Sequence, residues 1–355
     1  MVLLGLEVRF LRVLREVEWA PGEGLNLIVG GNGAGKTSLL EAVFLTARGR
    51  SFRSGRWVDL ITEGMDAGRV EGRYRSDGGA FTRVEVRQLG AVRRMEMDGK
   101  AVQTREAVVR KIPLRLLHSH SGELILGGPA LRRSFVDWNL FHVEPSYPDL
   151  WRRYRRCHAQ KSAILKEGRG DLGIWNRELA LHGDAMVEAR AAYVKAMNEE
   201  LTHVVEGFGP LSSLRVGYET KGYSGDLGSA LDAIKEQEWR SGQCLVGPHR
   251  DDLTIEMDGH LCKGVASAGQ ARLAVAALQI AAERIFRARM ARSSIWLLDD
   301  LGAEWDEQAQ ADCLRGILKV AKQCLVTSIG RPKDSLLRPY PHTLFHVEHG
   351  VLSRI

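Results

Sequence analysis

GGNGAGKTSLLEAVFL, residues 30–45 of this 355-residue chain, is its strongest indication of fold class. It fits the phosphate-binding pattern G-x-x-x-x-G-K-[ST] from Gly30 to Thr37. The apolar run LNLIV before it (25–29) predicts a buried strand, and SLLEAVFLTA after its lysine and threonine (38–47) predicts a helix. Such a loop turns several backbone N–H groups toward one anion, and the helix N-terminus adds partial positive charge. We therefore predict a nucleotide site rather than an ordinary glycine-rich turn.

Two side chains of this loop have defined roles in the predicted site. Lys36 is expected to reach the β- and γ-phosphates, and the Thr37 hydroxyl is expected to complete a Mg²⁺ shell. ATP and Mg²⁺ are therefore the predicted cofactors. The loop residues predicted to bind the nucleotide are Gly30, Gly31, Asn32, Gly33, Ala34, Gly35, Lys36, Thr37 and Ser38.

Composition is that of a globular protein from a reducing compartment. No apolar run approaches the ~18 residues needed to span a bilayer, and the N-terminal sequence lacks the basic start of a signal peptide. The five cysteines form no C-x-x-C pair, so neither a disulfide framework nor a zinc motif is expected. A net charge of +6 favours a polyanionic partner. We expect a cytoplasmic location and no membrane partner.

An acidic pair at the end of an apolar run supplies the predicted second half of the site. SSIWLLDD (293–300) has the form of a Walker B strand. Asp299 is expected to hold Mg²⁺ together with Thr37, and Asp300 to orient or deprotonate the attacking water. Asp306 follows seven residues after Asp299 (306 − 299), where ABC-type ATPases have an acidic D-loop.

A third segment, SAGQARLAVAALQIA (267–281), favours the ABC class of ATPases. In such ATPases, Ser-x-Gly-Gln at a helix start closes on the γ-phosphate held by a second subunit. Ser267, Gly269 and Gln270 are therefore predicted to contact the nucleotide across an ATP-dependent homodimer. The alternative is a plain capped helix, since serine is also a good N-cap residue. The position of Ser267, 32 residues before Asp299 (299 − 267), favours the signature.

The distance between the two halves of the site predicts the domain organisation. Lys36 and Asp299 are 263 positions apart (299 − 36), which implies an insertion within one ATPase sheet. Short strand-like segments fill residues 1–115, whereas residues 131–191 are helical in pattern and rich in charge. We predict an α/β fold: an ABC-type P-loop head with a mixed sheet from residues 1–120 and 245–355, and an inserted, mainly helical arm from residues 121–244.

The chain resembles the RecF family of recombination-repair proteins, relatives of the SMC heads, over almost its whole length. Beside the P loop, the resemblance is based on GRSFRS (49–54), GGPALRRSFVDWNLFHVEP (127–145), VGPHRDDL (246–253), the segment from Ser267 and LLDDLGAEWD (297–306). The joint occurrence of GGP..RR.F.DW and GPHRDDL is highly specific for this family.

The resemblance implies a DNA-repair function. RecF-like proteins bind ATP, dimerise around it and hold duplex DNA beside single-strand gaps, binding single-stranded DNA only weakly. With RecR and RecO, they help to load RecA. The resemblance thus implies a weak, DNA-stimulated ATPase whose slow hydrolysis drives release. The alternative is another ABC-type ATPase, a transporter subunit or an SMC-like head, without a RecA-loading role.

The resemblance gives other residues less definite roles. Arg12 matches an arginine that lies near the nucleotide base in related heads, although a surface arginine on a strand is an equal alternative. In GPHRDDL we expect a turn into a strand and assign no catalytic role. HSHSGEL (118–124) departs from the usual Q-loop pattern of the family, so the sensor residue is left open, with His118 and His120 as the candidates. Thr327 and Ser328 stand where transporter ATPases have a switch histidine.

A basic run gives the expected DNA contacts. Residues 151–170 contain seven Lys or Arg residues and one acidic residue. Such a run can follow a phosphate backbone by charge without reading bases. The alternative is a solvated basic helix face. The residues predicted to contact DNA are Arg152, Arg153, Arg155 and Arg156.

Overall fold

The computed structural model divides into two compact units. It describes residues 1–56, 58–90, 92–209, 211, 213–302 and 305–355. Unit 1 contains Met1–Ser121, Gly207–Gly209 and Met290–Ile355, and unit 2 contains Gly122–Glu206 and Pro210–Arg289. The two ends of the chain therefore fold together, and the middle of the chain folds separately.

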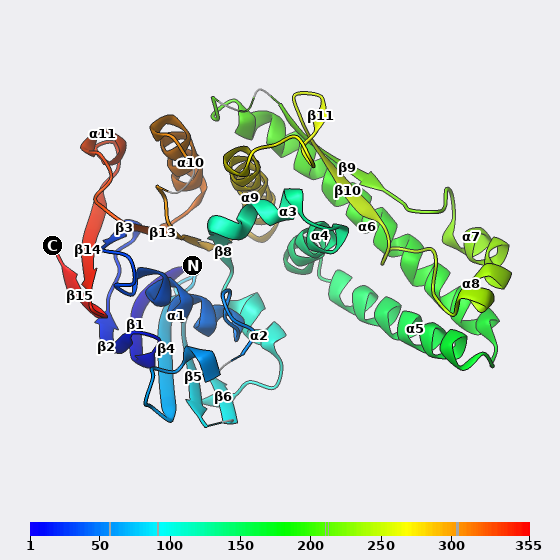
Figure 1. Ribbon diagram of the computed structural model, residues 1–355, viewed down its shortest axis with the longest axis horizontal. Helices are drawn as coiled ribbons and strands as arrows, with labels where there is room; N and C mark the ends of the chain where they lie inside the picture. Colours follow the sequence, from blue (N-terminus) through cyan, green and yellow to red (C-terminus); the bar gives the residue numbers. More distant parts are fainter. Residues whose placement is uncertain (57, 91, 210, 212, 303–304) are drawn as a thin grey trace. The chain divides into compact units, whose positions relative to one another are not determined.

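An antiparallel sheet forms one layer of unit 1 (Figure 1). Its strand order is β2-β1-β4-β5-β6-β7, and every neighbouring pair is antiparallel. Burial alternates along Glu16–Trp19 of β2 and along most of β5, as expected for strands with one buried face. The strands are β1 (Val2–Leu11), β2 (Leu14–Trp19), β4 (Ala67–Arg75), β5 (Phe81–Leu89), β6 (Val92–Met97) and β7 (Lys100–Ala101).

A second, mostly parallel sheet forms the other layer. Its strand order is β15-β14-β3-β13-β12-β8, with only β15 antiparallel to its neighbour. The apolar runs predicted as strands at 25–29 and 295–298 both lie in this sheet. The strands are β3 (Gly24–Val29), β8 (Leu114–Leu117), β12 (Ile295–Leu298), β13 (Gln323–Ser328), β14 (His342–Glu348) and β15 (Val351–Arg354).

Helix α1 (Lys36–Arg48) is buried on all sides in the core of unit 1. All its residues except Thr37 are buried, and the core cluster around it draws on strands of both sheets. Apolar residues occur on every side of the helix, as is typical of a helix in such a central position. The remaining helices of the unit are α2 (Arg105–Lys111), α10 (Glu307–Val320) and α11 (Asp334–Leu337), with short 3₁₀ turns η1 (Val58–Leu60) and η2 (Ser119–Gly122).

Unit 2 combines a helical hairpin with a small antiparallel sheet. Helices α5 (Tyr147–Glu167) and α6 (Leu172–Val205) pack side by side along the hairpin (Figure 1). The sheet order is β11-β10-β9, formed by β9 (Leu214–Glu219), β10 (Asp252–Met257) and β11 (His260–Leu261). The other helices are α3 (Glu123–Leu126), α4 (Pro129–Val143), α7 (Leu227–Ala233), α8 (Lys235–Ser241) and α9 (Ala268–Met290).

The boundary of unit 2 differs from the predicted domain boundary at residues 245–289. The prediction assigned these residues to the head, but β10 pairs with β9, which lies within the inserted region. Helix α9 also contacts this unit, because Arg284 forms an ion pair with Glu200 of α6 and Phe286 packs against His142 of α4. These residues are close in sequence to the Walker B strand, but closeness in sequence does not reveal tertiary contacts.

The GPHRDDL segment is a turn that leads into β10, as predicted. Asp251 is completely buried and accepts hydrogen bonds from the hydroxyls of Tyr218 (2.5 Å) and Tyr223 (3.3 Å). Asp252 accepts two hydrogen bonds from the buried Arg132, at 2.8 and 3.0 Å. Burial is the main cause that lowers the pKa of His249, to about 3. The segment thus holds several elements of unit 2 together.

A second buried ion pair joins α5 to α8. Lys161 and Glu238 lie 2.5 Å apart, and both side chains have no exposed surface. Glu238 also accepts a hydrogen bond from the backbone N–H of Leu245, at 2.9 Å. Because both charges are out of water, each depends on its partner for stabilisation.

Gly30 directly follows β3 and lies so close to β14 that no side chain would fit between them. A Cβ on Gly30 would lie 2.2 Å from the carbonyl oxygen of Val347, whereas a Cβ on Gly31 would contact nothing within 4 Å. The first glycine of the loop is therefore required by backbone packing, independently of any ligand.

We predict that Gly30→Ala lowers the free energy of unfolding by about 1–3 kcal/mol, because the methyl group forces β3 and β14 apart. Gly31→Ala is the matched control, since the same substitution meets open space one residue later. Urea denaturation followed by circular dichroism measures both variants. Equal stability of the two variants would show that the close approach to Val347 does not limit this position.

We also predict that Lys161→Met destabilises unit 2 by about 3–5 kcal/mol, because it leaves a buried carboxylate without its cation. The double variant Lys161→Met, Glu238→Gln should regain most of this loss, since glutamine is neutral and keeps an oxygen for the Leu245 N–H. The same denaturation experiment compares the two. A double variant no more stable than the single one would contradict the assigned role of the ion pair.

Candidate nucleotide site

The candidate site lies at the carboxyl ends of adjacent parallel strands in unit 1. The P loop follows β3, Asp299 follows β12, and β13 lies between these two strands and ends in Thr327 and Ser328. Carboxyl ends of parallel strands meet at one edge of a sheet, which is the usual ligand-binding edge of α/β folds. The topology therefore brings together residues that are 263 positions apart.

The P loop ends at the N-terminus of α1 in a conformation that needs glycine. Gly35 has φ 118°, and no side chain caps the first turn of the helix. A Cβ on Gly35 would also lie 2.9 Å from Leu14 and 3.1 Å from Val13. The backbone N–H groups at this helix start thus remain directed at the loop, as an anion site requires.

The Lys36 ammonium is held at the start of the loop. It donates hydrogen bonds to the carbonyl oxygens of Gly30 (2.7 Å) and Gly31 (2.8 Å). Burial lowers the pKa of Lys36, while the carboxylates of Asp300 and Asp299 act in the opposite direction. The cation therefore lies inside the loop and near both acidic residues predicted from the sequence.

A chain of hydrogen bonds connects the P loop to the acidic pair. The hydroxyl of Thr37 donates to Asp299 Oδ1 at 3.0 Å, and the hydroxyl of Thr327 donates to the same oxygen at 2.8 Å. Thr327 also accepts a hydrogen bond from the backbone N–H of Asp300 at 2.8 Å. Asp300 has φ 58°, a left-handed conformation that aspartate tolerates better than most residues. Thr327 thus orients both acidic residues.

A cavity of about 280 Å³ brings most of the predicted residues together. Its wall contains the P-loop lysine, both acidic residues and two arginines from different segments. The lining residues are Arg12, Val13, Asn32, Gly33, Ala34, Gly35, Lys36, Thr37, Ser38, Arg53, Asp299, Asp300, Thr327 and Ile329.

The placement of Arg12 depends on a buried carboxylate within α1. Glu41 has no exposed surface and accepts hydrogen bonds from Arg12 Nε (3.1 Å) and Nη2 (3.3 Å). Arg12 donates a third hydrogen bond to the carbonyl oxygen of Asp59 at 2.7 Å. Arg53 lies 3.9 Å from the same carboxylate. Arg53 was not predicted to line the site from the GRSFRS segment, and the only signal for it is the carboxylate of Glu41 in the P-loop helix, which it shares with Arg12.

The signature residues form a capping box at the start of α9 in unit 2. Ser267 Oγ accepts a hydrogen bond from the N–H of Gln270 (3.2 Å), and Gln270 Oε1 accepts one from the N–H of Ser267 (2.9 Å). Both residues are exposed, and Gly269 is partly buried beside them. Ser267 and Gln270 therefore cap the helix, as the alternative interpretation predicted. Their exposure also leaves them accessible to a second chain.

Asp306 is not among the described residues that line the cavity. Its carboxylate caps α10 by accepting a hydrogen bond from the N–H of Ala309 at 2.8 Å. Ala303 and Glu304, within the quoted LLDDLGAEWD segment, lie outside the described residues. The structure thus gives Asp306 a capping role and does not bring it to the P loop of its own chain.

His118 and His120 follow β8, next to the Walker B strand. Their rings are 5.9 Å apart between centroids, and the His118 ring lies 5.8 Å from that of Phe52. Neither histidine is among the residues that line the cavity in the described part of the chain. Their substitution for a Q-loop sensor therefore stays a prediction.

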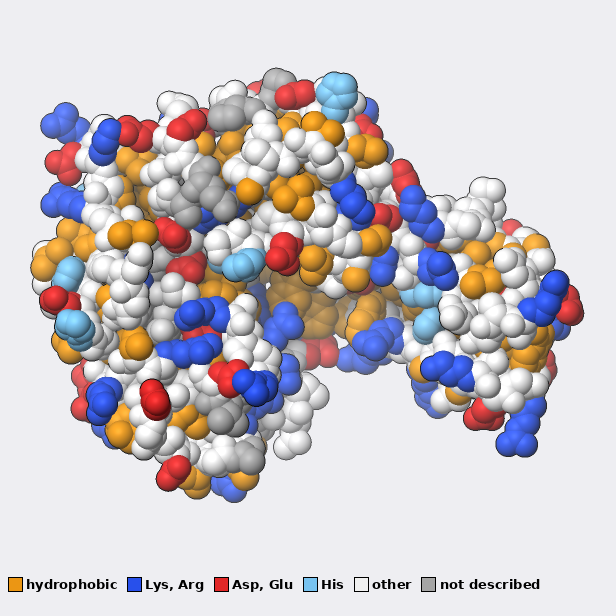
Figure 2. All heavy atoms as spheres, viewed as in Figure 1, with side chains coloured by type: hydrophobic (Ala, Val, Ile, Leu, Met, Phe, Trp, Pro, Cys, Tyr) orange, Lys and Arg blue, Asp and Glu red, His pale blue; other side chains and the backbone are white. Residues whose placement is uncertain are grey.

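The predicted DNA-contacting arginines are all exposed on α5. Arg152 forms an ion pair with Asp149, and Arg155 stacks over Trp151 at 4.7 Å from the ring centroid. Tyr154 and Cys157, between and beside them, are buried. Figure 2 shows several Lys and Arg side chains over the region of α5 with few acidic ones among them. Arg132 and Arg133 of α4 bond Asp252 and the backbone of Asp251, so they are packing residues rather than candidates for DNA contact.

The helices in the described part of the chain include none with the length and apolar character needed to cross a bilayer.

Comparison with known proteins identifies the family. The RecF/RecN/SMC N-terminal domain family matches residues 2–336. "DNA replication and repair protein RecF" of Thioalkalivibrio sulfidiphilus (strain HL-EbGR7) is 35% identical over 99% of each chain. The protein of the same name from Xanthomonas axonopodis pv. citri (strain 306) is 34% identical over 98% of this chain and 97% of that one.

Solved structures confirm the predicted fold class. A structure described as the recombination mediator protein RecF-ATP in the RecFOR pathway aligns with a TM-score of 0.84 at 22% identity, covering 99% of this chain and 97% of that one. An SMC head bound to the C-winged helix domain of ScpA aligns with a TM-score of 0.62 at 14% identity, covering 100% of this chain and 97% of that one. The α/β ABC-type ATPase fold with an inserted lobe is therefore shared with both. From the family match and these full-length relatives, the chain belongs to the RecF family of DNA replication and repair proteins.

Proposed function

We propose that this protein is an ATP-dependent DNA-binding ATPase of gap repair. The observation that supports ATP binding best is the convergence of Lys36, Thr37 and Asp299 on one cavity at the helix N-terminus. A triphosphate there would accept hydrogen bonds from the loop N–H groups and from Lys36, in place of the carbonyl oxygens of Gly30 and Gly31. Arg12 and Arg53 add positive charge along the same cavity.

The residues present also fit Mg²⁺. The Thr37 hydroxyl and the Asp299 carboxylate lie 3.0 Å apart, and both are hard oxygen ligands of the kind that Mg²⁺ prefers. These two residues would hold the ion, directly or through water. When bound, Mg²⁺ would neutralise charge on the β- and γ-phosphates.

Asp300 is the residue proposed to act on the attacking water. It follows Asp299 directly, lines the same cavity, and has its backbone N–H fixed by Thr327. Its carboxylate can accept a proton from water or orient it for attack. An aspartate is one methylene group shorter than the glutamate of transporter ATPases, which agrees with slow hydrolysis used as a timer.

An ATP-bridged homodimer is the proposed active form. Ser267 and Gln270 are exposed at the start of α9, where small residues and a helix N-terminus can meet the γ-phosphate held by a second chain. Asp306, the proposed D-loop residue, would contact the opposite subunit. Dimerisation would then depend on the γ-phosphate, and hydrolysis would release it.

The partners proposed for this chain are those that its family membership implies. The solved structure of RecF-ATP is described as a recombination mediator of the RecFOR pathway, and we propose RecR, with RecO, as partners of this chain in loading RecA at single-strand gaps. Duplex and gapped DNA would contact the basic face of α5, and hydrolysis would respond weakly to DNA. This role implies a cytoplasmic, nucleoid-associated protein. An SMC-like head or transporter subunit is the alternative, and it would share the nucleotide site without gapped-DNA binding.

We predict that Asp300→Asn keeps near-parental ATP affinity but lowers the hydrolysis rate at least ~10-fold, because asparagine cannot accept the proton. Asparagine tolerates the left-handed backbone of this position as well as aspartate does. Asp98→Asn is the matched control, since Asp98 has φ 53° in a turn between β6 and β7 of the same unit. Turnover assays with titrated ATP measure both. Undiminished hydrolysis in Asp300→Asn would remove Asp300 from the mechanism.

A second prediction concerns the basic face of α5. Replacing Arg152, Arg153, Arg155 and Arg156 with Ala should weaken DNA binding equally across sequences and reduce the slope of log K against log salt by up to ~3.6, if each arginine neutralises one phosphate. A charge-matched control replaces Arg177, Lys195, Lys235 and Arg240, which are exposed in the same unit. Salt titrations of gapped-DNA binding compare the two. If both variants gave the same slope of log K against log salt, the arginines of α5 would be solvated residues that do not contact DNA.

A further inference from the structure

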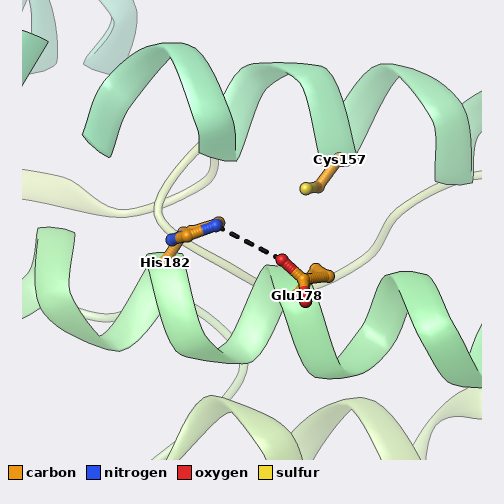
Figure 3. Close-up of side chains that lie close together, drawn as sticks. All are labelled: Cys157, Glu178 and His182. Carbon is orange, nitrogen blue, oxygen red and sulfur yellow. Dashed lines mark ion pairs between the residues drawn. The ribbon is translucent and has the colours of Figure 1, made fainter. Parts of the chain in front are cut away.

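A cluster of three possible metal ligands lies between the two long helices of unit 2 (Figure 3). Cys157 projects from α5, and Glu178 and His182 project from α6 toward it. Among the described residues, no other group of three Cys, His, Asp or Glu side chains has its ligand atoms close enough together to hold one metal ion. The nucleotide site and the basic face of α5 use none of the three.

The hairpin geometry explains why these residues meet. Cys157 lies ten residues before the end of α5 (167 − 157), and His182 lies ten residues after the start of α6 (182 − 172). In an antiparallel hairpin, positions equally far from the connection lie at the same level. Glu178 is one turn before His182, so both side chains lie on one face of α6.

The distances suit a tetrahedral ion after small side-chain rotations. His182 Nε2 and Glu178 Oε2 are 3.4 Å apart. Two ligand atoms bound to tetrahedral zinc are also ~3.4 Å apart, because each lies about 2.0–2.2 Å from the metal. The three ligand atoms all lie within 4.8 Å of one another. Any of these atoms that lie farther apart than ~3.4 Å must approach one another when an ion binds.

Two of the three side chains are held in the protein interior, and the third is open to solvent. Cys157 and His182 are largely buried, whereas half of the Glu178 side chain is exposed. Metal could therefore enter from the Glu178 side, and water could occupy a fourth position. A thiolate and a carboxylate together neutralise the two charges of the ion, so a bound divalent cation would leave no net charge within the hairpin.

We propose that Cys157, Glu178 and His182 form a zinc-binding site that joins α5 to α6. Thiolate, imidazole and carboxylate are the ligands that zinc takes in proteins, and thiolate disfavours Mg²⁺ and Ca²⁺. Cys157 directly follows the exposed arginines of α5. Zinc at this position would hold the basic helix against α6, and its role would be structural rather than catalytic.

The proposal is tested on the full chain by titration with Zn²⁺ and, separately, with Co²⁺. The parent should bind one zinc per chain at this site and unfold at a higher temperature with zinc present. Cobalt should give the tetrahedral visible bands and the near-ultraviolet thiolate charge-transfer band. Cys157→Ser should lose the charge-transfer band, and Glu178→Gln and Cys157→Ser should each lower zinc affinity at least ~10-fold.

Matched controls separate this site from general metal binding. Cys244→Ser removes another buried thiol of unit 2, and Glu188→Gln removes an exposed carboxylate elsewhere on α6. Both should retain the parental stoichiometry and cobalt spectrum. Glu178 is exposed, so its substitution keeps the test valid if a change at Cys157 impairs folding. An unchanged zinc affinity in Glu178→Gln, or no thiolate band in the cobalt-loaded parent, would overturn the proposal.

Discussion

The hydrogen bond between Thr37 and Asp299 is the contact on which the nucleotide site depends. It joins the first turn of α1 to the end of β12, across 262 residues of chain (299 − 37). Thr327 reinforces it by donating to the same carboxylate oxygen from the strand between them. Because all three residues lie at the carboxyl edge of one parallel sheet, any displacement of β3, β13 or β12 would separate the lysine from the acidic pair. The packing of Gly30 against β14 fixes one of these strands.

Unit 2 is stabilised in a different way, through buried charge. Arg190 of α6 binds the Asp137 carboxylate with both Nε (2.8 Å) and Nη2 (2.9 Å), and donates to the carbonyl oxygen of Pro248 at 2.7 Å. Asp251 and the Lys161–Glu238 pair add further buried polar contacts. Such networks are stable only when every member is paired, so they specify one arrangement of the helices. The GPHRDDL segment, which marks the family in sequence, contributes to this network.

Local motifs were predictable from the sequence, and tertiary contacts were not. The strand, P loop and helix around residues 25–47 follow from apolar patterning and glycine spacing, and the Walker B strand follows from four apolar residues before an acidic pair. The recognition of the family and of its α/β fold is confirmed. Arg53 was not predicted as a cavity residue, because no spacing pattern in the sequence connects it with the P loop; in the structure it lies 3.9 Å from Glu41 of the P-loop helix. The zinc ligands were also overlooked, since Cys157 and His182 are 25 positions apart (182 − 157) and match no motif.

We propose that two chains share each ATP site, and a mixture of two inactive variants gives a direct test. Lys36→Met removes the phosphate-binding cation, and Ser267→Arg places a bulky side chain in the proposed dimer interface while leaving its own P loop intact. A heterodimer of the two combines Lys36 from one chain with Ser267 from the other in one intact site. Each variant alone should be inactive, and their mixture should regain part of the parental ATPase rate. Normal hydrolysis by Ser267→Arg alone, as a monomer, would contradict it.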